Sequence, residues 1–327
     1  MKAIVYHEYG MPDVLRCEEV PTPAPQPDQV LIKVRAASVN PLDWRFMKGE
    51  PALMRLFIGL RKPRMNRPGI DLAGEVEAVG SKVTQFKPGD EVFGSARGTF
   101  AEYVCTVESK IALKPEQVTF AQAASINVAG LTAIQGLRDH GKVQAGHKVL
   151  INGAAGGVGT FAVQLARIFG AHVTGVCSTR NLELVKSIGA DEVIDYTRDD
   201  FSRSSERYDF IFDCVGNHSF SECKRVLSPS GRFIGIGAPH DANLIALLAP
   251  AIRDVVFSVF TKQKTVMFIA KPSQKDLSRL AELVANGKLK PVIDKSYSFS
   301  DAAAAVSHVE QGHARGKVII EVAPGGD

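Results

Sequence analysis

The sequence predicts an α/β protein that combines a doubly wound parallel sheet with a β-rich segment. Residues 1 to about 120 contain short apolar runs and turn signals, whereas strands and helical patterns alternate from about Thr119 onward. Near the middle of the chain, a glycine-rich turn joins a strand to a helix over residues 148–170. Strands separated by helices form parallel sheets. A length of 327 residues exceeds what one core normally supports, so two domains are expected.

The β-rich segment contains several candidate strands. Val30–Val34 is an apolar run, and Gly74–Gly80 alternates like a strand that is half buried. A further short strand is expected at Glu91–Phe93, after the turn signal Pro88–Asp90. Proline cannot donate a hydrogen bond to a sheet, so Pro21–Pro27 is expected to be an extended surface connector.

The second half of the chain carries the alternating pattern. We expect helices over residues 120–138, 277–285 and 302–309, and strands over residues 172–177, 192–195, 209–213 and 232–237. A last strand over residues 317–322 could return to the N-terminal domain.

The glycine-rich turn is the clearest candidate for a binding site. It follows the apolar run Val149–Ile151 and precedes residues that repeat at helical spacing. Glycines allow a pyrophosphate to approach the backbone, and the helix N-terminus presents unpaired N–H groups to it. The pattern departs from GxGxxG in that Ala154 takes the place of the first glycine. We expect a dinucleotide to bind here, at Gly153, Ala155, Gly156, Gly157 and Val158.

The end of the next strand indicates which dinucleotide is bound. An NAD site usually places Asp or Glu there, but no acid occurs between Asn152 and Leu182. Ser178 can donate a hydrogen bond to a phosphate oxygen, and the planar guanidinium of Arg180 suits a 2′-phosphate. Arg180 could instead be a solvated residue of the following helix. The absence of an acid independently favours NADPH.

Ligands of doubly wound sheets lie at the carboxyl ends of the strands. This rule adds Cys214, Val215, Gly237 and Ala238 to the expected cofactor site, beside Asp213. Each of these residues could equally be ordinary packing at a strand end.

Composition excludes several classes of function. A dispersed net charge of +4 argues against a nucleic-acid partner. The five cysteines form no CxxC pair and fit buried free thiols of a reducing compartment, so a cytoplasmic protein is expected. The N-terminus has no signal-peptide pattern, and the apolar stretch 244–260 is too short and too charged to span a membrane.

Several motifs together resemble one family over essentially the whole chain. They are MKAIVY, DQVLIKV, SVNPLDWRFMKG, GIDLAGEVEAVGSKVTQFKPGDEVFG, TFAEYV, ASINVAGLTAIQGL, NGAAGGVG, IDYTRDDF and HARGKVII. The chain resembles the zinc-free quinone oxidoreductase-like branch of the medium-chain dehydrogenase/reductase superfamily. The resemblance implies a GroES-like catalytic domain at residues 1–120, a Rossmann domain at 121–262 and a C-terminal segment, 263–327, that returns to the catalytic domain.

The resemblance also bears on metal binding. Zinc enzymes of this superfamily use a catalytic cysteine and a histidine, but this chain has Asn40 and Ile70 at those places. Isoleucine cannot bind a metal, and asparagine is a poor ligand for zinc. We therefore expect no zinc.

A reductase without a metal favours acceptors that already accept hydride, such as quinones and α,β-unsaturated carbonyls. Asn40 is the best candidate for a polar contact to nicotinamide or substrate, unless it merely holds the Asn40–Pro41 turn. Arg45 could stabilise a developing enolate, although it cannot supply a proton. Asp43 could orient its neighbours, but we favour a cap for the helix that Trp44 begins.

Three further cofactor contacts come from the resemblance. In relatives, Tyr196 matches a position near the 2′-phosphate and Lys317 matches a basic residue near the cofactor. Phe268 is expected to contact the nicotinamide, although a core phenylalanine is the alternative.

Two stretches could set specificity or assembly. Residues 47–67 are basic and predict either an amphipathic surface helix or a lid over the substrate. Residues 244–260 are apolar, and in relatives this region contributes to the pocket and to a dimer interface, so a homodimer is expected.

Three functions compete at this point. The leading one is an NADPH-dependent reductase of quinones or activated alkenes. An NADPH-dependent aldehyde or ketone reductase is weaker, because none of the tyrosines starts a Tyr-x-x-x-Lys pair. A low-turnover NADPH-binding redox sensor stays open because no proton donor is evident.

Overall fold

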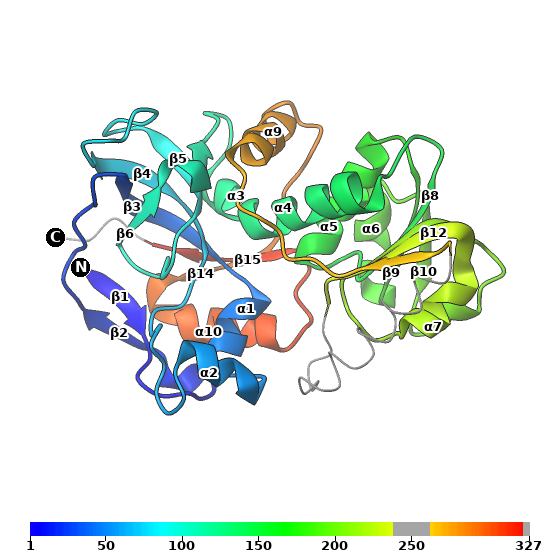
Figure 1. The fold of residues 1–327 in the computed structure, drawn as a ribbon, viewed down its shortest axis with the longest axis horizontal. Helices are drawn as coiled ribbons and strands as arrows, with labels where there is room; N and C mark the ends of the chain where they lie inside the picture. The colour runs from blue at the N-terminus through cyan, green and yellow to red at the C-terminus, as the bar shows by residue number, and fades with distance from the viewer. Residues whose placement is uncertain (238–261, 323–327) are drawn as a thin grey trace. The chain divides into compact units, whose positions relative to one another are not determined.

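A computed structural model describes residues 1–237 and 262–322 of the chain (Figure 1). They form two compact units, which we call unit 1 (residues 1–131 and 271–327) and unit 2 (residues 132–270). The strands are β1 (Lys2–Val5), β2 (Arg16–Glu19), β3 (Gln29–Val39), β4 (Asp71–Val79), β5 (Glu91–Ser95), β6 (Tyr103–Val107), β7 (Ile111–Leu113), β8 (Lys148–Asn152), β9 (His172–Cys177), β10 (Glu192–Asp195), β11 (Tyr208–Asp213), β12 (Leu227–Gly235), β13 (Lys264–Val266), β14 (Ile293–Ser298) and β15 (Lys317–Glu321). The α-helices are α1 (Pro41–Lys48), α2 (Arg55–Ile58), α3 (Phe120–Ala124), α4 (Asn127–Gln135), α5 (Gly157–Ile168), α6 (Leu182–Ser187), α7 (Phe220–Cys223), α9 (Gln274–Ala285) and α10 (Ala302–Glu310).

Unit 1 is built on a sheet of seven strands. Six of them follow the order β14-β15-β3-β4-β5-β7, and β6 pairs with β3. The long strand β3 pairs antiparallel with β4 and with β15, so the last strand of the chain joins the N-terminal strands. This pairing confirms the expected return of the chain over residues 317–322.

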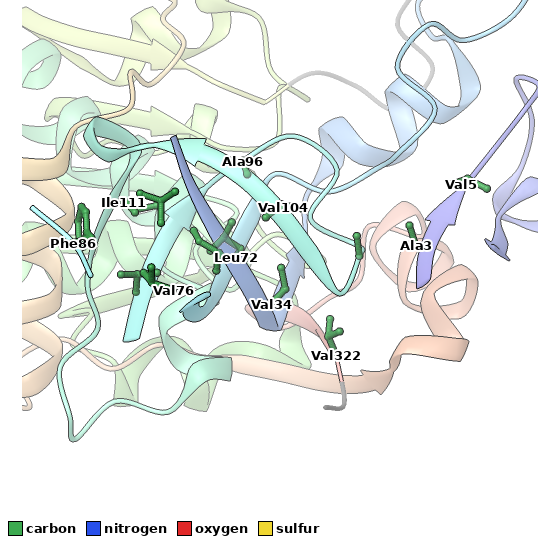
Figure 2. Close-up of a cluster of buried hydrophobic side chains, with 14 residues drawn as sticks. Ala3, Val5, Val34, Leu72, Val76, Phe86, Ala96, Val104, Ile111 and Val322 are labelled. Atoms are coloured by element: carbon green, nitrogen blue, oxygen red, sulfur yellow. The ribbon is translucent and has the colours of Figure 1, made fainter. Parts of the chain in front are cut away.

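The core of unit 1 consists of small aliphatic side chains from this sheet and from β1. Val34, Leu72, Val76, Val104 and Ile111 are each at most 3% exposed and pack in one cluster (Figure 2). Their alternation along the strands follows from the two-residue period of a β-strand. Burial of this face fixes the register of β3 against β4, because a one-residue slip would expose it.

Unit 2 is a doubly wound parallel sheet. Its strand order is β10-β9-β8-β11-β12-β13, and every pairing is parallel. Numbered within the unit, this order is 3-2-1-4-5-6, which is that of the Rossmann fold. The direction of winding reverses between β8 and β11, so ligands are expected at the carboxyl ends of these two strands. The predicted α/β class, with a Rossmann sheet and a β-rich unit, is thereby confirmed.

The helix expected over residues 120–138 is not continuous. It is divided into α3, α4 and a π-helical turn over Gly136–Gly141. Both glycines of this turn pack closely on the sheet, since a Cβ on Gly136 would lie 2.7 Å from the ring of Phe212 and one on Gly141 would lie 2.8 Å from the ring of Phe210.

The prediction of one amphipathic helix within residues 47–67 is wrong. Helix α1 ends at Gly49, which has a φ of +64°, and α2 ends at Gly59, which has a φ of +122°. Non-glycine residues rarely adopt such angles, so the two glycines stop the helices.

No helix in the part of the chain that the structure describes has both the length and the apolar character needed to cross a bilayer. The five cysteines are all unpaired, as expected, but Cys17 is exposed and not buried.

Candidate active site and cofactor site

The turn between β8 and α5 has an open, tight backbone. Gly153 has a φ of +79°, and a Cβ on Gly159 would lie 2.1 Å from the Gly153 carbonyl oxygen. At Gly156, the N-cap of α5, a Cβ would meet only that same oxygen at 3.4 Å and otherwise open space. A phosphate can therefore approach the backbone and the N-terminus of this twelve-residue helix. These features fit a dinucleotide pyrophosphate.

The departure of the turn from GxGxxG has a packing explanation. Ala154 is fully buried, and its Cβ lies 3.1 Å from the position that a Cβ on Gly175 would take. Gly175 belongs to the neighbouring strand β9. The methyl group of Ala154 thus fills space that a glycine in the adjacent strand leaves free.

Asp213 organises the loop after β11. Its Oδ1 accepts hydrogen bonds from the Asn152 side chain at 2.8 Å and from the N–H groups of Val215 and Gly216 at 3.0 and 2.9 Å. A Cβ on Gly153 would lie 2.7 Å from the Val215 side chain, and one on Gly237 would lie 2.4 Å from the Val215 backbone.

The structure therefore brings Val215 and Gly237 to the glycine turn, together with Cys214, whose N–H donates to the Asn152 carbonyl at 3.0 Å. Burial raises the pKa of the Cys214 thiol, so it is not a reactive thiolate at neutral pH. Ala238 lies outside the described residues.

The expected 2′-phosphate residues lie at the ends of two adjacent strands. Strands β9 and β10 pair with Asp195 opposite Cys177, and the Tyr196 N–H donates to the Cys177 carbonyl at 3.0 Å. Ser178 and Arg180 follow β9 directly, while Tyr196 follows β10 and is 57% exposed. The register of one strand pair thus brings these backbone segments together.

Phe268 follows β13 and packs on the π-helical turn. Its ring centroid lies 4.3 Å from that of His140. Its ring also lies 3.3 Å from the position that a Cβ on Gly136 would take.

In unit 1, Asn40 is buried and has partners on both ends of its amide. Its Nδ2 donates to Asp71 Oδ2 at 2.9 Å and to the Ser38 carbonyl at 3.3 Å. Its Oδ1 accepts from Lys317 Nζ at 2.8 Å. These bonds leave the second lone pair of Asn40 Oδ1 unused. Any contact of Asn40 with substrate or cofactor would therefore use that lone pair or displace one of these hydrogen bonds.

Asp71 and Lys317 form the charged centre of this cluster. Asp71 is fully buried and accepts from Ser38 Oγ at 2.7 Å, from the Asn127 side chain at 2.8 Å and from the Val128 N–H at 3.1 Å. Lys317 is 3% exposed, and its ammonium also lies 3.4 Å from Asp71 Oδ2 and from the Val39 carbonyl. The Lys317 ammonium thus contacts Val39, Asn40 and Asp71, which all belong to unit 1.

Asp43 caps α1 from its first turn. Its carboxylate accepts from the N–H of Asn40 at 2.7 Å and from that of Gly69 at 3.0 Å. The predicted capping role is confirmed, but the helix begins at Pro41 and not at Trp44. Burial, with a smaller contribution from the negative Asp71, raises the pKa of Asp43 to about 7, against the opposing effect of the two N–H bonds.

Arg45 is half-buried on the same helix. Its guanidinium carbon lies 4.8 Å from the centroid of the buried Trp44 ring. Burial lowers the pKa of Arg45 from its ordinary value of 12.5.

The segment after α1 is held at two points. The hydroxyl of Tyr9 donates to the Gly59 carbonyl at 2.5 Å, and that of Tyr6 to the Met65 carbonyl at 2.7 Å. On either side of Gly59, Phe57 is 81% exposed and Leu60 is 66% exposed.

Within residues 1–237 and 262–322, no group of three or more His, Cys, Asp or Glu side chains could hold a metal ion. The two places where the resemblance implies zinc ligands in zinc enzymes hold Asn40 and Ile70, and the ammonium of Lys317 donates a hydrogen bond to Asn40.

Sequence analysis gave no role to Asp71, Asn127 or Asp195, which the structure places in the two candidate sites. A signal for Asp71 was available, because an acid at the start of the apolar run Asp71–Val79 needs a buried partner. The identity of that partner depends on the pairing of β3 with β15, which no local pattern contains.

Comparison with known proteins agrees with both units. Residues 26–116 match the family model described as alcohol dehydrogenase GroES-like domain, and residues 188–320 match the one described as zinc-binding dehydrogenase. That description applies to the family and does not identify ligands in this chain.

Individual relatives cover almost the whole chain. The chloroplast envelope quinone oxidoreductase homolog of Arabidopsis thaliana is 37% identical over 98% of each chain. The NADPH-dependent alkenal/one oxidoreductase of the same plant is 36% identical over 99% of this chain and 80% of the relative. The structure of the quinone oxidoreductase from Coxiella burnetii has a TM-score of 0.87 and 33% identity, covering 98% of this chain and 99% of that one. The chain therefore belongs to the quinone oxidoreductase-like branch of the medium-chain dehydrogenase/reductase superfamily.

Proposed function

We propose that this protein is an NADPH-dependent oxidoreductase that reduces quinones or α,β-unsaturated carbonyls without a metal ion. The observation that carries the proposal is the open glycine turn at the switch point of a 3-2-1-4-5-6 parallel sheet. Relatives named quinone oxidoreductase and NADPH-dependent alkenal/one oxidoreductase support the choice of acceptor and coenzyme.

Unit 2 would hold the coenzyme. The turn residues Gly153, Ala155, Gly156, Gly157 and Val158 would hold the pyrophosphate. Ser178, Arg180 and Tyr196 would hold the 2′-phosphate, because hydroxyl and guanidinium groups suit its oxygens. The proposed coenzyme site also contains Cys214, Val215, Gly237, Ala238 and Phe268. NADPH, when bound, supplies a hydride from its nicotinamide C4.

Unit 1 would supply the catalytic groups. We assign Asn40 to orient nicotinamide or substrate through its remaining lone pair, and Arg45 to stabilise negative charge on the acceptor oxygen. Lys317 would contribute to the cofactor site through Asn40. The positively charged Lys317 ammonium donates to Asn40 Oδ1 at 2.8 Å and so fixes the orientation of the Asn40 amide. Asn40 stands where zinc enzymes of the superfamily carry a metal ligand. A lysine bonded to this residue supports chemistry that does not depend on zinc.

Assembly and compartment are proposed from the sequence alone. We propose a homodimer, because the apolar stretch 244–260, which lies outside the described residues, needs a cover, and a cytoplasmic location, because the cysteines show no disulfide framework. Light scattering coupled to gel filtration tests the first, and a mass of one chain would contradict it.

The acceptor class is tested with a panel of 1,4-benzoquinone, 9,10-phenanthrenequinone, an alkyl vinyl ketone and a simple aldehyde, each with NADPH. We expect turnover of a quinone or of the enone and little of the aldehyde. Turnover of the aldehyde alone would establish the carbonyl reductase instead. Tight NADPH binding without any oxidation would favour the redox sensor.

A further inference from the structure

Asp195 is a buried acid beside a site that is proposed to bind a phosphate. It ends β10 directly opposite Cys177, the residue before Ser178, and it is 7% exposed. In an NAD site, the acid that accepts hydrogen bonds from the ribose hydroxyls stands at the end of the strand after the glycine turn, which here is β9. Asp195 ends the neighbouring strand β10, so that role does not account for a buried acid at the edge of the proposed NADPH site.

The carboxylate of Asp195 is occupied by two threonines from different segments. Its Oδ2 accepts from Thr179 Oγ1 at 2.5 Å, and its Oδ1 accepts from the N–H and Oγ1 of Thr197 at 3.0 and 2.8 Å. The two hydroxyl oxygens lie 3.1 Å apart. Thr179 stands between Ser178 and Arg180, and Thr197 follows Tyr196. One carboxylate thus ties together the two backbone segments that carry the proposed 2′-phosphate residues.

The hydrogen bonds of the tie favour the ionised form of Asp195. The hydrogen bond from Thr179, followed by those from Thr197, holds the pKa of Asp195 below its ordinary value. The N–H groups of Arg198 and Asp199 also donate to the Asp195 carbonyl at 3.0 and 2.9 Å, which closes the loop after β10. The two threonines thus fill three of the roughly four acceptor positions of the Asp195 carboxylate, and Arg198 Nε lies 3.8 Å from Oδ2, so the carboxylate is directed at its own loops.

We propose that Asp195 is a positioning residue that, through Thr179 and Thr197, fixes the cradle for the 2′-phosphate and so sets the preference for NADPH. This inference rests on the proposed function, because it takes NADPH as the coenzyme. Its role differs from that of an acid which binds the ribose or repels the phosphate.

The test measures binding of adenosine 2′,5′-bisphosphate and adenosine 5′-monophosphate by titration calorimetry, so that no turnover is required. Asp195→Ala and Thr179→Val remove the tie, and we expect each to weaken the bisphosphate about fivefold or more, with less than about a twofold change for the monophosphate. Asp195→Asn removes the charge but can still bond both threonines, and Thr179→Ser keeps the hydroxyl. Both conservative variants should bind the bisphosphate within about twofold of the parent.

Tighter binding of the bisphosphate by Asp195→Ala and Asp195→Asn would overturn the proposal in favour of simple repulsion. Unchanged binding by Asp195→Ala, or an equal loss of both ligands, would also overturn it. Thr179 is exposed, so its variants test the tie even if Asp195→Ala fails to fold. Failure of the proposed coenzyme is a separate result, because the parent protein would then bind the two nucleotides equally.

Discussion

Among the proposed cofactor residues, Arg180 is the one on which we expect the coenzyme preference to depend most directly. It follows β9 at the strand end where an NAD site normally carries an acid. Its fixed charge and planar donors suit a dianionic phosphate, and NADH offers no such group.

Replacing Arg180 by alanine should raise the KM for NADPH about tenfold or more, the loss of one charged contact worth roughly 1.5–3 kcal/mol, and should leave NADH nearly unchanged. Initial rates with both coenzymes measure the effect. Arg203→Ala is the matched control, because Arg203 is also exposed and pairs with Asp200 elsewhere in unit 2. An equal effect on both coenzymes would disprove the assignment.

A second prediction concerns the contribution of Lys317 to stability through its buried ion pair with Asp71. Replacing it by methionine leaves Asp71 buried without a cationic neighbour, which we expect to reduce the free energy of unfolding by about 3 kcal/mol. In Asp71→Asn/Lys317→Met the uncompensated charge is gone, so the double variant should lose less than the sum of the two single variants. Urea denaturation of all four proteins gives the coupling, and strict additivity would show that the two charges do not interact.

At the scale of elements, helix α1 and the glycine turn each have a local test. The cap of α1 contains Asp43, whose pKa is raised by burial from 3.8 to about 7. Between about pH 4 and 7 the folded protein then holds a proton that the unfolded chain has lost. The contribution of Asp43 to stability is therefore fully present at acid pH and falls as the pH rises through this window.

Replacing Asp43 by asparagine removes this titration. The free energy of unfolding of the parent should drop more between pH 4 and pH 7 than that of Asp43→Asn, because only the parent must ionise a buried group. Urea denaturation at several pH values gives both curves. Parallel curves would mean that the Asp43 carboxyl titrates alike in the folded and unfolded states.

The glycine turn separates a coenzyme effect from a folding effect. Gly156 has an extended backbone with a φ of −82° and open space around its Cβ position, so Gly156→Ala should fold normally and bind NADPH about tenfold more weakly. Gly159→Ala is the contrast, because its Cβ would clash with the Gly153 carbonyl at 2.1 Å and should lower the melting temperature. The two variants are compared by thermal unfolding and by fluorescence titration with NADPH. A stable Gly156→Ala protein with unchanged affinity would place the pyrophosphate elsewhere.

At the scale of the whole molecule, local patterns predicted elements better than their partners. Strands β9 and β10 appear at the predicted residues because β-branched runs bounded by turns are local signals. The helix expected over residues 120–138 is divided into α3, α4 and a π-helical turn, and a single helix over residues 47–67 is excluded by the positive φ angles of Gly49 and Gly59. The buried pair Asp71–Lys317 could not be predicted locally, since its members are 246 residues apart and meet only through strand pairing.

The coenzyme site was more accessible to sequence reasoning than the site in unit 1. Glycine spacing and the missing acid each occur within a short segment, so Gly156 and Arg180 could be proposed from local sequence alone. For Asn40 the sequence left a choice between a contact and a turn, and the structure adds bonds to Asp71 and Lys317 that neither interpretation contained.

The most direct test of the proposed function is the rate of NADPH oxidation by 9,10-phenanthrenequinone after exhaustive metal chelation, with NADH measured in parallel. We expect turnover to survive chelation, with a kcat/KM for NADPH at least about tenfold above that for NADH, as one charged phosphate contact would provide. Activity that disappears on chelation and returns with zinc, or equal use of the two coenzymes, would contradict it.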